Sequence, residues 1–268
     1  MNLEAYFRRI GYTGAPDPTL ATLRELHLKH PLAIAFENLD PLARRPVRLE
    51  LPALQDKLVT QRRGGYCFEQ NLLFAHVLRA IGLDPVALVA RVVWDRGDDG
   101  SRPRTHMLLL VDLEEGRFIA DVGFGGLTMT APLRLDAVEP QRTPHETFQV
   151  FRDGDSYAVE AEAGGLVKTL YRFDLQPQRQ VDIEVLNHYV ATHPSSPFLE
   201  SLRAARAAPD GRYALRDNRL TVRRAGAVEQ RGLESAAELR AVLAETFGID
   251  VPNTREVEAA LQRIAKVR

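Results

Sequence analysis

The sequence contains one cysteine and one tryptophan in 268 residues, and it has no surplus of either charge. A single cysteine cannot form an internal disulfide, which points to a reducing compartment such as the cytoplasm. The 35 basic and 36 acidic side chains nearly cancel, which argues against nucleic acid or an anionic membrane as a partner. The apolar runs are too short to span a membrane, and we expect no secretory signal. The composition therefore predicts a soluble cytoplasmic protein without a charge-driven partner.

The only cysteine, Cys67, lies in the stretch R-R-G-G-Y-C-F-E-Q-N at residues 62–71. Gly64 and Gly65 allow a positive φ and a close backbone approach, and residues 68–80 carry apolar side chains at helical spacing. This pattern places the sulfur in the first turn of a helix, where unpaired N–H groups and the helix dipole favour the nucleophilic thiolate. The two arginines that precede the glycines would add to this field. By itself, a lone cysteine is equally often a small buried apolar residue.

A nucleophilic cysteine needs a base and a third group that orients the base. His106 stands at the start of a predicted buried strand, 107–111, and Asp121 directly follows a second predicted strand, 117–120. The turn between the two strands is short, so the strands are expected to pair and to bring His106 and Asp121 together. The sequence therefore predicts a catalytic set of Cys67, His106 and Asp121.

Three stretches around these residues resemble the arylamine N-acetyltransferase family of the bacterial type. They are the cysteine stretch, T-H-M around His106, and D-V-G-F-G-G from Asp121. Further segments resemble the family in the same order: A-F-E-N-L-D (35–40), A-P-L-R-L (131–135) and N-H-Y-V-A-T-H-P-S-S-P-F (187–198). The resemblance is specific in the catalytic stretches, extends to about Phe198 and is weak beyond Pro209.

The resemblance implies ping-pong transfer of an acetyl group from acetyl-CoA, through an acetyl-cysteine, to the nitrogen of arylamines or arylhydrazines. Transfer to the oxygen of N-hydroxyarylamines, and a role in xenobiotic metabolism, would follow. The family positions that bind coenzyme A correspond here to Thr105, Phe124, Gly125 and Gly126. The family positions that line the acceptor pocket correspond to Phe36, Val93, Phe124 and Phe198. The implied partners are coenzyme A and a small arylamine or hydrazine, with no metal and with the protein a monomer or homodimer.

The local patterns and the resemblance together predict an α+β fold with a cysteine-peptidase-like Cys-His-Asp core. We expect an N-terminal helical bundle (residues 1–84), a central antiparallel β-barrel (85–192), and an interdomain segment with a C-terminal α/β lid (193–268). The bundle would carry the nucleophile, and the barrel would carry the histidine and the aspartate. The patterns also predict a flexible loop over 95–104, a short strand over 181–184 and an amphipathic link over 198–207.

Some features fit more than one interpretation. His27 and His30 lie three residues apart on a predicted helix. Because no cluster of carboxylates or cysteines accompanies them, they are interpreted as ordinary helix-end residues and not as metal ligands. A cysteine peptidase or transglutaminase-like enzyme would use the same Cys-His-Asp order, and the family also admits an amide-forming polyketide cyclase. A non-catalytic binding module is a third alternative. Thioester-dependent acylation of Cys67 without peptide cleavage would favour the acetyltransferase.

Overall fold

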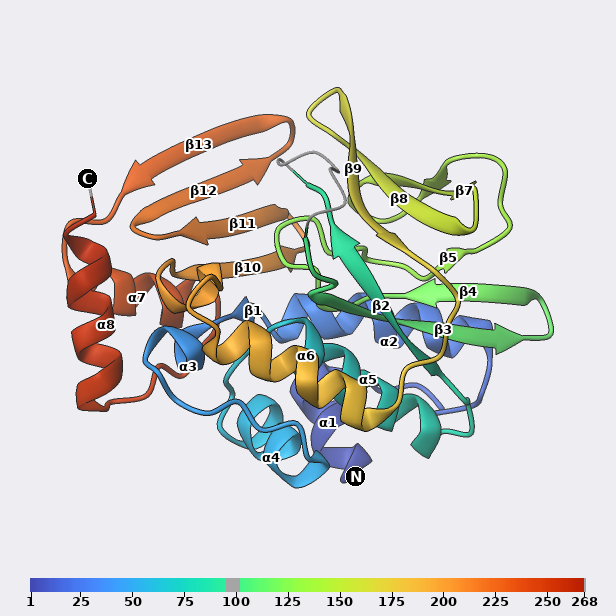
Figure 1. The fold of residues 1–268 in the computed structure, drawn as a ribbon, viewed down its shortest axis with the longest axis horizontal. Helices are drawn as coiled ribbons and strands as arrows, with labels where there is room; N and C mark the ends of the chain where they lie inside the picture. Colours follow the sequence, from blue (N-terminus) through green and yellow to red (C-terminus); the bar gives the residue numbers. More distant parts are fainter. Residues whose placement is uncertain (95–101, 268) are drawn as a thin grey trace.

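A computed structural model describes residues 1–94 and 102–267 of the chain. Part of the loop predicted over 95–104 therefore lies outside the described residues. Helices from the first half of the chain, together with α6, lie beneath two sheets, and α7 and α8 lie at the end that carries the C-terminus (Figure 1). Within the described residues, no helix is long and apolar enough to cross a membrane.

The N-terminal region is helical, and local caps explain where its first helix begins and ends. The Asn2 side chain accepts the N–H of Ala5, and Gly11 ends the helix with a φ of 68°. The elements follow in the order α1 (Leu3–Ile10), α2 (Leu20–Ala33), β1 (Phe36–Glu37), α3 (Leu39–Leu42), α4 (Leu51–Gln55), a π-helical turn (Asp56–Thr60) and α5 (Cys67–Ala80).

An eight-stranded antiparallel sheet follows in the described chain, with the strand order β5-β4-β3-β2-β9-β8-β7-β6. Its strands are β2 (Val86–Val92), β3 (His106–Leu113), β4 (Gly116–Ala120), β5 (Leu133–Arg134), β6 (Gln141–Arg142), β7 (Thr147–Asp153), β8 (Ser156–Ala163) and β9 (Leu166–Phe173). β5 near one edge returns close to β7 near the other, so the sheet is nearly closed. This confirms the predicted α+β class with a central antiparallel barrel.

Strand β3 is buried on both faces, which explains its nearly continuous apolar sequence. Met107, Leu109 and Val111 belong to the core shared with the helices, whereas Leu108 and Leu110 belong to the core enclosed by the sheet. The strand therefore joins the two cores, and its first residue, His106, lies at their boundary.

A second sheet combines distant parts of the chain, with the order β1-β10-β11-β12-β13. The last part of the chain supplies α6 (Gln180–Thr192), a 3-10 turn (Pro197–Leu199), β10 (Arg203–Ala208), β11 (Gly211–Arg216), β12 (Arg219–Arg224), β13 (Ala227–Gly232), α7 (Ala236–Glu245) and α8 (Arg255–Ala265). Strand β10 pairs with β1 through Ala205 and Phe36. The predicted link over 198–207 is therefore wrong, because residues 203–207 belong to a strand that pairs with both β1 and β11.

The short strand predicted over 181–184 is also wrong, because these residues form the start of α6. The Asp182 side chain accepts the N–H of Arg179 at 3.1 Å and caps the helix. Ile183 and Val190, seven residues apart on one face, pack into the core of the N-terminal helices. The predicted division at residues 84 and 192 stays a prediction.

Candidate active site

Cys67 is the first residue of α5, and it is buried against the start of β3. Its Sγ lies 3.6 Å from the backbone carbonyl oxygen of Thr105. The entry into α5 is fixed by Glu69, whose Oε2 accepts the N–H of Tyr66 at 3.1 Å. The helix start thus places the sulfur beside the residue that precedes His106.

Glycine is needed in the turn before the nucleophile because neighbouring atoms pack closely there, and not because the backbone adopts a positive φ. Neither Gly64 nor Gly65 has a positive φ, whereas Arg62 has a φ of 49°, so the expectation of a positive φ at these glycines is wrong. A Cβ on Gly64 would lie 2.1 Å from the carbonyl oxygen of Ala35. A Cβ on Gly65 would lie 2.7 Å from Oε2 of Glu69. A side chain at either position would displace the turn that leads into the cysteine helix.

His106 and Asp121 meet as predicted, at the start of β3 and just beyond the end of β4, which pair as antiparallel neighbours. His106 Nε2 lies 2.6 Å from Asp121 Oδ2, and both side chains are buried. Burial alone would lower the pKa of His106, but the charge and hydrogen bond of Asp121, followed by a hydrogen bond with Cys67, raise this pKa to about 10. His106 is therefore protonated at neutral pH while it contacts both other members of the set.

Asp121 is held by groups on several elements, which sequence reasoning missed. Asn71, one turn after Cys67 on α5, donates Nδ2 to Asp121 Oδ1 at 3.0 Å, and the N–H of Gly123 donates to the same oxygen at 2.9 Å. Burial alone would raise the pKa of Asp121, but the charge of His106 and these hydrogen bonds lower it. A polar side chain four positions after the nucleophile, on a mostly apolar helix, was the signal that could have identified Asn71.

Gly123 lets the loop after β4 approach the start of α5. A Cβ at this position would lie 2.9 Å from the Cα of Cys67 and 3.0 Å from Nδ2 of Asn71. Both atoms belong to a buried helix that has no room to move. The absence of a side chain at Gly123 therefore permits Asp121 to reach the histidine beside the cysteine.

Aromatic rings enclose the histidine on the side of the large sheet. The His106 ring lies 4.9 Å from the Tyr171 ring and 5.2 Å from the Phe124 ring, measured between centroids. The Trp94 ring packs against Phe124 in a tilted arrangement, with centroids 5.7 Å apart. Burial raises the pKa of Tyr171 well above its usual range, and the charge of Asp121 adds to this, so the phenol stays neutral. Aromatic side chains thus pack against the His106 ring where it does not contact Asp121 and Cys67.

The residues predicted to bind coenzyme A lie close to this array. The Thr105 carbonyl faces the sulfur, and the Phe124 ring contacts His106 edge to face. The N–H of Gly125 donates to Thr128 Oγ1 at 2.6 Å. Gly126 lies beside Trp94, since a Cβ there would be 3.3 Å from the indole. Their roles in binding coenzyme A stay predictions.

The residues predicted to line an acceptor pocket are brought together in part. The rings of Phe36 and Phe198 lie 6.1 Å apart, edge to face, and the missing Cβ of Gly125 would touch the Phe36 ring at 3.6 Å. This places Phe36 next to the loop that carries Phe124. Val93 is buried just after β2. Contact between Phe36 and a bound acceptor stays a prediction.

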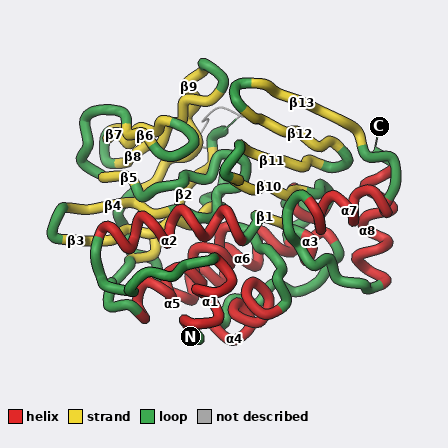
Figure 2. The backbone as a smooth tube through the Cα atoms, turned by 180° about the vertical axis from the view of Figure 1, so that it is seen from behind, coloured by secondary structure: helices red, strands yellow, loops and turns green. Residues whose placement is uncertain are grey.

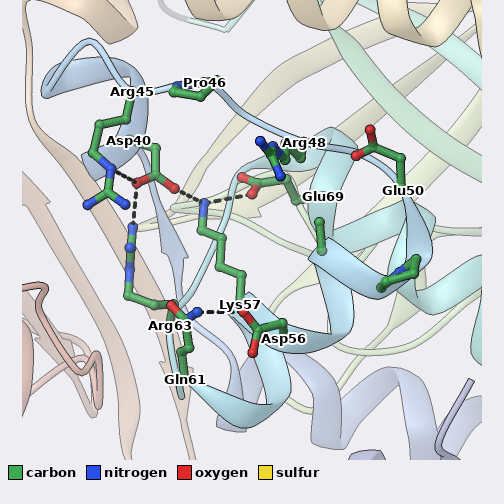
Figure 3. Close-up of a pocket in the computed structure, with 12 residues that line it drawn as sticks. Asp40, Arg45, Pro46, Arg48, Glu50, Asp56, Lys57, Gln61, Arg63 and Glu69 are labelled. Atoms are coloured by element: carbon green, nitrogen blue, oxygen red, sulfur yellow. Dashed lines mark hydrogen bonds and ion pairs between the residues drawn. The ribbon is translucent and has the colours of Figure 1, made fainter.

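A separate cavity of about 550 Å³ lies behind the cysteine helix and is lined by charged side chains (Figure 3). Lys57 Nζ lies 2.6 Å from Asp40 Oδ2 and 2.6 Å from Glu69 Oε1. Arg63 Nη2 lies 2.7 Å from Glu37 Oε1, so its charge is neutralised there and does not act on the thiol as expected. None of the three catalytic candidates lines this cavity. Its dense charge makes it unsuitable for an apolar ligand.

The buried cysteine, protonated histidine and aspartate can carry out nucleophilic acyl chemistry. The imidazolium can stabilise a thiolate and later return its proton to a leaving group. Among the described residues, no group of three or more histidine, cysteine or acidic side chains could hold a metal ion. The geometry alone fits both acyl transfer and hydrolysis.

Comparison with known proteins distinguishes these chemistries. A family model described as N-acetyltransferase matches residues 19–256. The arylamine N-acetyltransferase of Mycolicibacterium smegmatis is 43% identical over 273 residues, which covers 100% of this chain and 98% of that protein. The Escherichia coli enzyme of the same name is 44% identical, with 94% and 90% of the two chains covered. The solved Mycobacterium marinum arylamine N-acetyltransferase in complex with CoA is 41% identical with a TM-score of 0.94, and the match covers 98% of this chain and 99% of that one.

Proposed function

Because the chain belongs to the arylamine N-acetyltransferase family, we propose that it transfers the acetyl group of acetyl-CoA to the nitrogen of an arylamine through an acetyl-cysteine. The observation that carries this proposal is the buried Cys67, His106 and Asp121 array in a chain that aligns with these enzymes over its full length. The chain is thus an acyltransferase with acetyl-CoA as co-substrate.

In the first half-reaction, His106 holds the proton of Cys67, and the thiolate attacks the thioester carbonyl of acetyl-CoA. The bond between the Cys67 sulfur and the carbonyl carbon forms, and the bond to the coenzyme A sulfur breaks. The departing thiolate takes the proton from His106, which leaves acetyl-cysteine and a neutral imidazole. The backbone N–H of Cys67, at the start of α5, is a donor for the developing oxyanion.

In the second half-reaction, the amine nitrogen attacks the acetyl-cysteine while neutral His106 accepts the proton that the nitrogen loses. The carbon–sulfur bond to Cys67 breaks, and the thiolate and imidazolium are restored. Asp121 keeps the imidazole in one orientation through both steps and stabilises its charged form. The co-substrates bind in turn, so the mechanism is ping-pong.

Aromatic side chains support an aromatic acceptor. Phe36, Phe198 and Phe124 lie on three different segments near the catalytic residues, and a weakly basic arylamine is neutral at physiological pH. A neutral planar amine or hydrazine needs an apolar wall and no fixed countercharge. A Salmonella typhimurium relative, 41% identical, is named both arylamine N-acetyltransferase and N-hydroxyarylamine O-acetyltransferase. We include the oxygen of N-hydroxyarylamines among the acceptors on this ground.

Intact-protein mass spectrometry after brief mixing with acetyl-CoA tests the proposal. We expect wild-type protein to gain one acetyl group and to lose it when an arylamine is added. Cys67→Ala should gain none, and His106→Gln should gain it far more slowly. Wild-type protein that stays unmodified with acetyl-CoA and with longer acyl thioesters would contradict the acetyltransferase and favour a hydrolase. An acetyl group that water alone removes as fast as the amine does would also contradict it.

The cellular setting and assembly follow from the same site. We place the enzyme in the cytoplasm because a nucleophilic thiol must remain reduced. A monomer or homodimer suffices, because Cys67, His106 and Asp121 all come from one chain. Light scattering at working concentration measures the assembly, and a larger oligomer would contradict this expectation.

A further inference from the structure

Two buried histidines of α2 remain outside the mechanism described so far. His27 and His30 lie about one turn apart and are both fully buried. Both rings contact the same phenylalanine edge to face, with centroids 5.8 Å and 5.5 Å from Phe74 of α5. Burying a polar ring costs free energy of desolvation unless the ring is hydrogen-bonded. Each of the two rings is therefore expected to make a hydrogen bond inside the protein.

His27 finds its partner at the catalytic aspartate. The backbone N–H of Asp121 donates to His27 Nε2 at 3.0 Å. Asp121 has just left β4, whose last residue, Ala120, pairs with Leu109, so this N–H lies beyond the ladder between β3 and β4. α2 and α5 lie beneath the sheet where β3 and β4 run (Figure 2). His27 thus gives the N–H of Asp121 a partner inside the protein.

The direction of this hydrogen bond fixes the protonation of His27. An N–H donor requires an unprotonated acceptor, so Nε2 carries no hydrogen and the ring proton is on Nδ1. Burial lowers the pKa of His27 to about 3, against the opposing charge of Asp121, and the other titratable group that faces it is His30. Nδ1 has no hydrogen-bond partner in any other residue that the structure describes. Among the described residues, the N–H of Asp121 is therefore the hydrogen-bond partner of the His27 ring.

The contacts of Asp121 divide into two kinds. His106, Asn71 and Gly123 hold the two oxygens of its carboxylate at 2.6, 3.0 and 2.9 Å. His27 holds its backbone. A carboxylate can orient an imidazole only if its own main chain is fixed, because a small displacement of a catalytic group lowers the rate strongly.

We propose that His27 is a positioning residue for the acetyl transfer, which fixes the backbone of Asp121 through Nε2 and so keeps the carboxylate aligned with His106. The inference rests on the proposed function of the Cys67, His106 and Asp121 array. His27 touches neither substrate nor the reacting sulfur, and it acts through Asp121 alone.

His30 provides a matched control on the same helix. Its Nδ1 lies 2.7 Å from the Tyr6 hydroxyl, and its Nε2 lies 2.6 Å from Gln70 Oε1. It shares the burial and the Phe74 contact of His27 but makes no hydrogen bond to Asp121 in the described structure. Replacing either ring with leucine removes a buried polar group from the same layer. An effect confined to His27 is then an effect on the catalytic aspartate and not on the packing of α2.

The test compares His27→Leu, His27→Gln and His30→Leu with wild-type protein, by the pH dependence of Cys67 alkylation with iodoacetamide and by the rate of acetylation. Alkylation reports the thiolate that the His106 and Asp121 pair supports. We expect His27→Leu to shift the alkylation profile to higher pH and to slow acetylation by about 10- to 100-fold. His27→Gln, whose side-chain oxygen can reach the same N–H, should stay within about threefold of wild type. His30→Leu should lower the melting temperature and leave the profile in place.

An unchanged profile in His27→Leu would overturn the proposal, and so would a loss in His27→Gln as large as that in His27→Leu. If His27→Leu does not fold, His27→Met takes its place, since its flexible chain can fill the ring volume. In wild-type protein, nitrogen NMR of labelled histidine should show the His27 proton on Nδ1, and a proton on Nε2 would also overturn the proposal. Wild-type protein that gains no acetyl group would instead refute the proposed function, so the two failures are distinguishable.

Discussion

At the scale of single residues, the central chemical property of the site is that His106 is protonated. The imidazole is buried, and burial alone would favour its neutral form. Asp121 reverses that preference through its charge and its hydrogen bond at 2.6 Å. The proton that the Cys67 thiol must lose is therefore already bound to the neighbouring His106. The same imidazolium is the acid that protonates the departing coenzyme A thiolate.

Replacing Asp121 should release that proton. In a Cys67→Ala background, where no thiol titrates, we expect NMR to show His106 still protonated at pH 8, because the charge and hydrogen bond of Asp121, the main causes of its raised pKa, remain. Adding Asp121→Asn should lower the pKa of His106 so that the ring is neutral at pH 8, since burial then acts unopposed. In the Cys67 protein, Asp121→Asn should reduce acetylation by at least about 100-fold.

The same shift has a consequence for stability. The folded protein raises the pKa of His106. The contribution of His106 to the free energy of unfolding is therefore fully present below the unfolded pKa of about 6.5 and is lost as the pH rises through about 10. Unfolding of Cys67→Ala in urea should therefore lose stability between pH 7 and 10 relative to Cys67→Ala/Asp121→Asn. Parallel pH curves for the two proteins would contradict the assigned coupling.

Gly123 makes a second residue-scale prediction. We expect Gly123→Ala to destabilise the protein by about 1–3 kcal/mol and to slow acetylation, because the added methyl would press on Cys67 and Asn71. Gly232→Ala is the control, since a Cβ on Gly232 would have no neighbouring atom within 4 Å and the φ of Gly232 is not positive. Urea unfolding and single-turnover acetylation measure the two effects. Equal stability in both variants would show that the loop after β4 can move away.

The sequence was sufficient to predict that Cys67 begins a helix and that His106 and Asp121 meet, because each lies at the beginning or end of an element with a clear pattern. Their catalytic roles stay predictions. The sequence was not sufficient for Asn71 and His27, whose partners are brought close by tertiary packing across α2, α5 and the sheet. His27 in particular was interpreted as an ordinary helix residue. Nothing in the spacing along its helix indicates that its ring meets the backbone of Asp121.

At the scale of elements, a buried ion network joins the turn after α4 to the start of α5. Lys57 lies between Asp40 and Glu69 (Figure 3). Arg63 pairs with Glu37 at 2.7 Å. Such pairs add little stability against apolar packing, but the loss of one partner leaves a buried charge uncompensated. The network therefore acts mainly to fix how the glycine turn enters the cysteine helix.

Removing the central cation tests this role. Lys57→Met should destabilise the protein by about 3–5 kcal/mol, because Asp40 and Glu69 would share a buried site without their common partner. Lys29→Met is the control, since the Lys29–Glu25 pair, at 3.7 Å, is much more exposed. Chemical unfolding measures both variants. A loss of less than about 1 kcal/mol in Lys57→Met would show that the network is not structurally important.

Glu69 should make stability depend on pH in the opposite sense from an ordinary surface carboxylate. Burial raises the pKa of Glu69 to about 7, against the opposing charge of Lys57. The folded protein then holds this proton more tightly than the unfolded chain, so the contribution is present below about pH 4.5 and is lost as the pH rises through about 7. Unfolding of wild type and Glu69→Gln should show wild type gaining stability relative to the variant as the pH falls from 8 to 5. A constant difference between them would contradict the assigned pKa.

The accuracy of element prediction followed the kind of interaction that forms each element. Helices α1 and α5 and the hairpin of β3 and β4 were predicted because their caps, apolar spacing and turn are local. Strand β13 was missed because all of its residues are exposed, so it has no alternating apolar pattern. β10 was missed because its sequence, R-A-A-R-A-A, has no β-branched or aromatic residue, although it pairs with the adjacent β11 along its length.

For the molecule as a whole, the C-terminal sheet and helices share one core with a segment near the N-terminus. Leu39 and Leu42 of α3 pack with Leu202, Leu261 and other residues from the last third of the chain. The Arg263 side chain donates to the carbonyl of Leu42 at 3.4 Å. The C-terminal sheet and helices therefore share a core with α3 and are not packed independently of the N-terminal region.

A core substitution in α8 should show this dependence. Leu261→Ala should cost about 2–5 kcal/mol, because it opens a cavity beside fully buried neighbours. Leu166→Ala, at a side chain that is 62% exposed, should be nearly neutral. Alkylation of Cys67 under mild denaturant should accelerate in Leu261→Ala together with loss of helical signal. If Cys67 stayed protected after the C-terminal region had melted, the two parts would be independent.

The pairing of β1 with β10 also bears on how the enzyme is made in the cell. Phe36 bridges to Gly65 in the turn before the nucleophile, and its other neighbour, Ala205, is translated much later. While the ribosome is still adding the last third of the chain, this edge and the apolar face of α3 have no partners. Synthesis must therefore be nearly finished before β1, which contacts the cysteine turn at Gly65, has neighbours on both sides. The nascent chain is thus expected to acquire its reactive thiol only when the whole fold can enclose it.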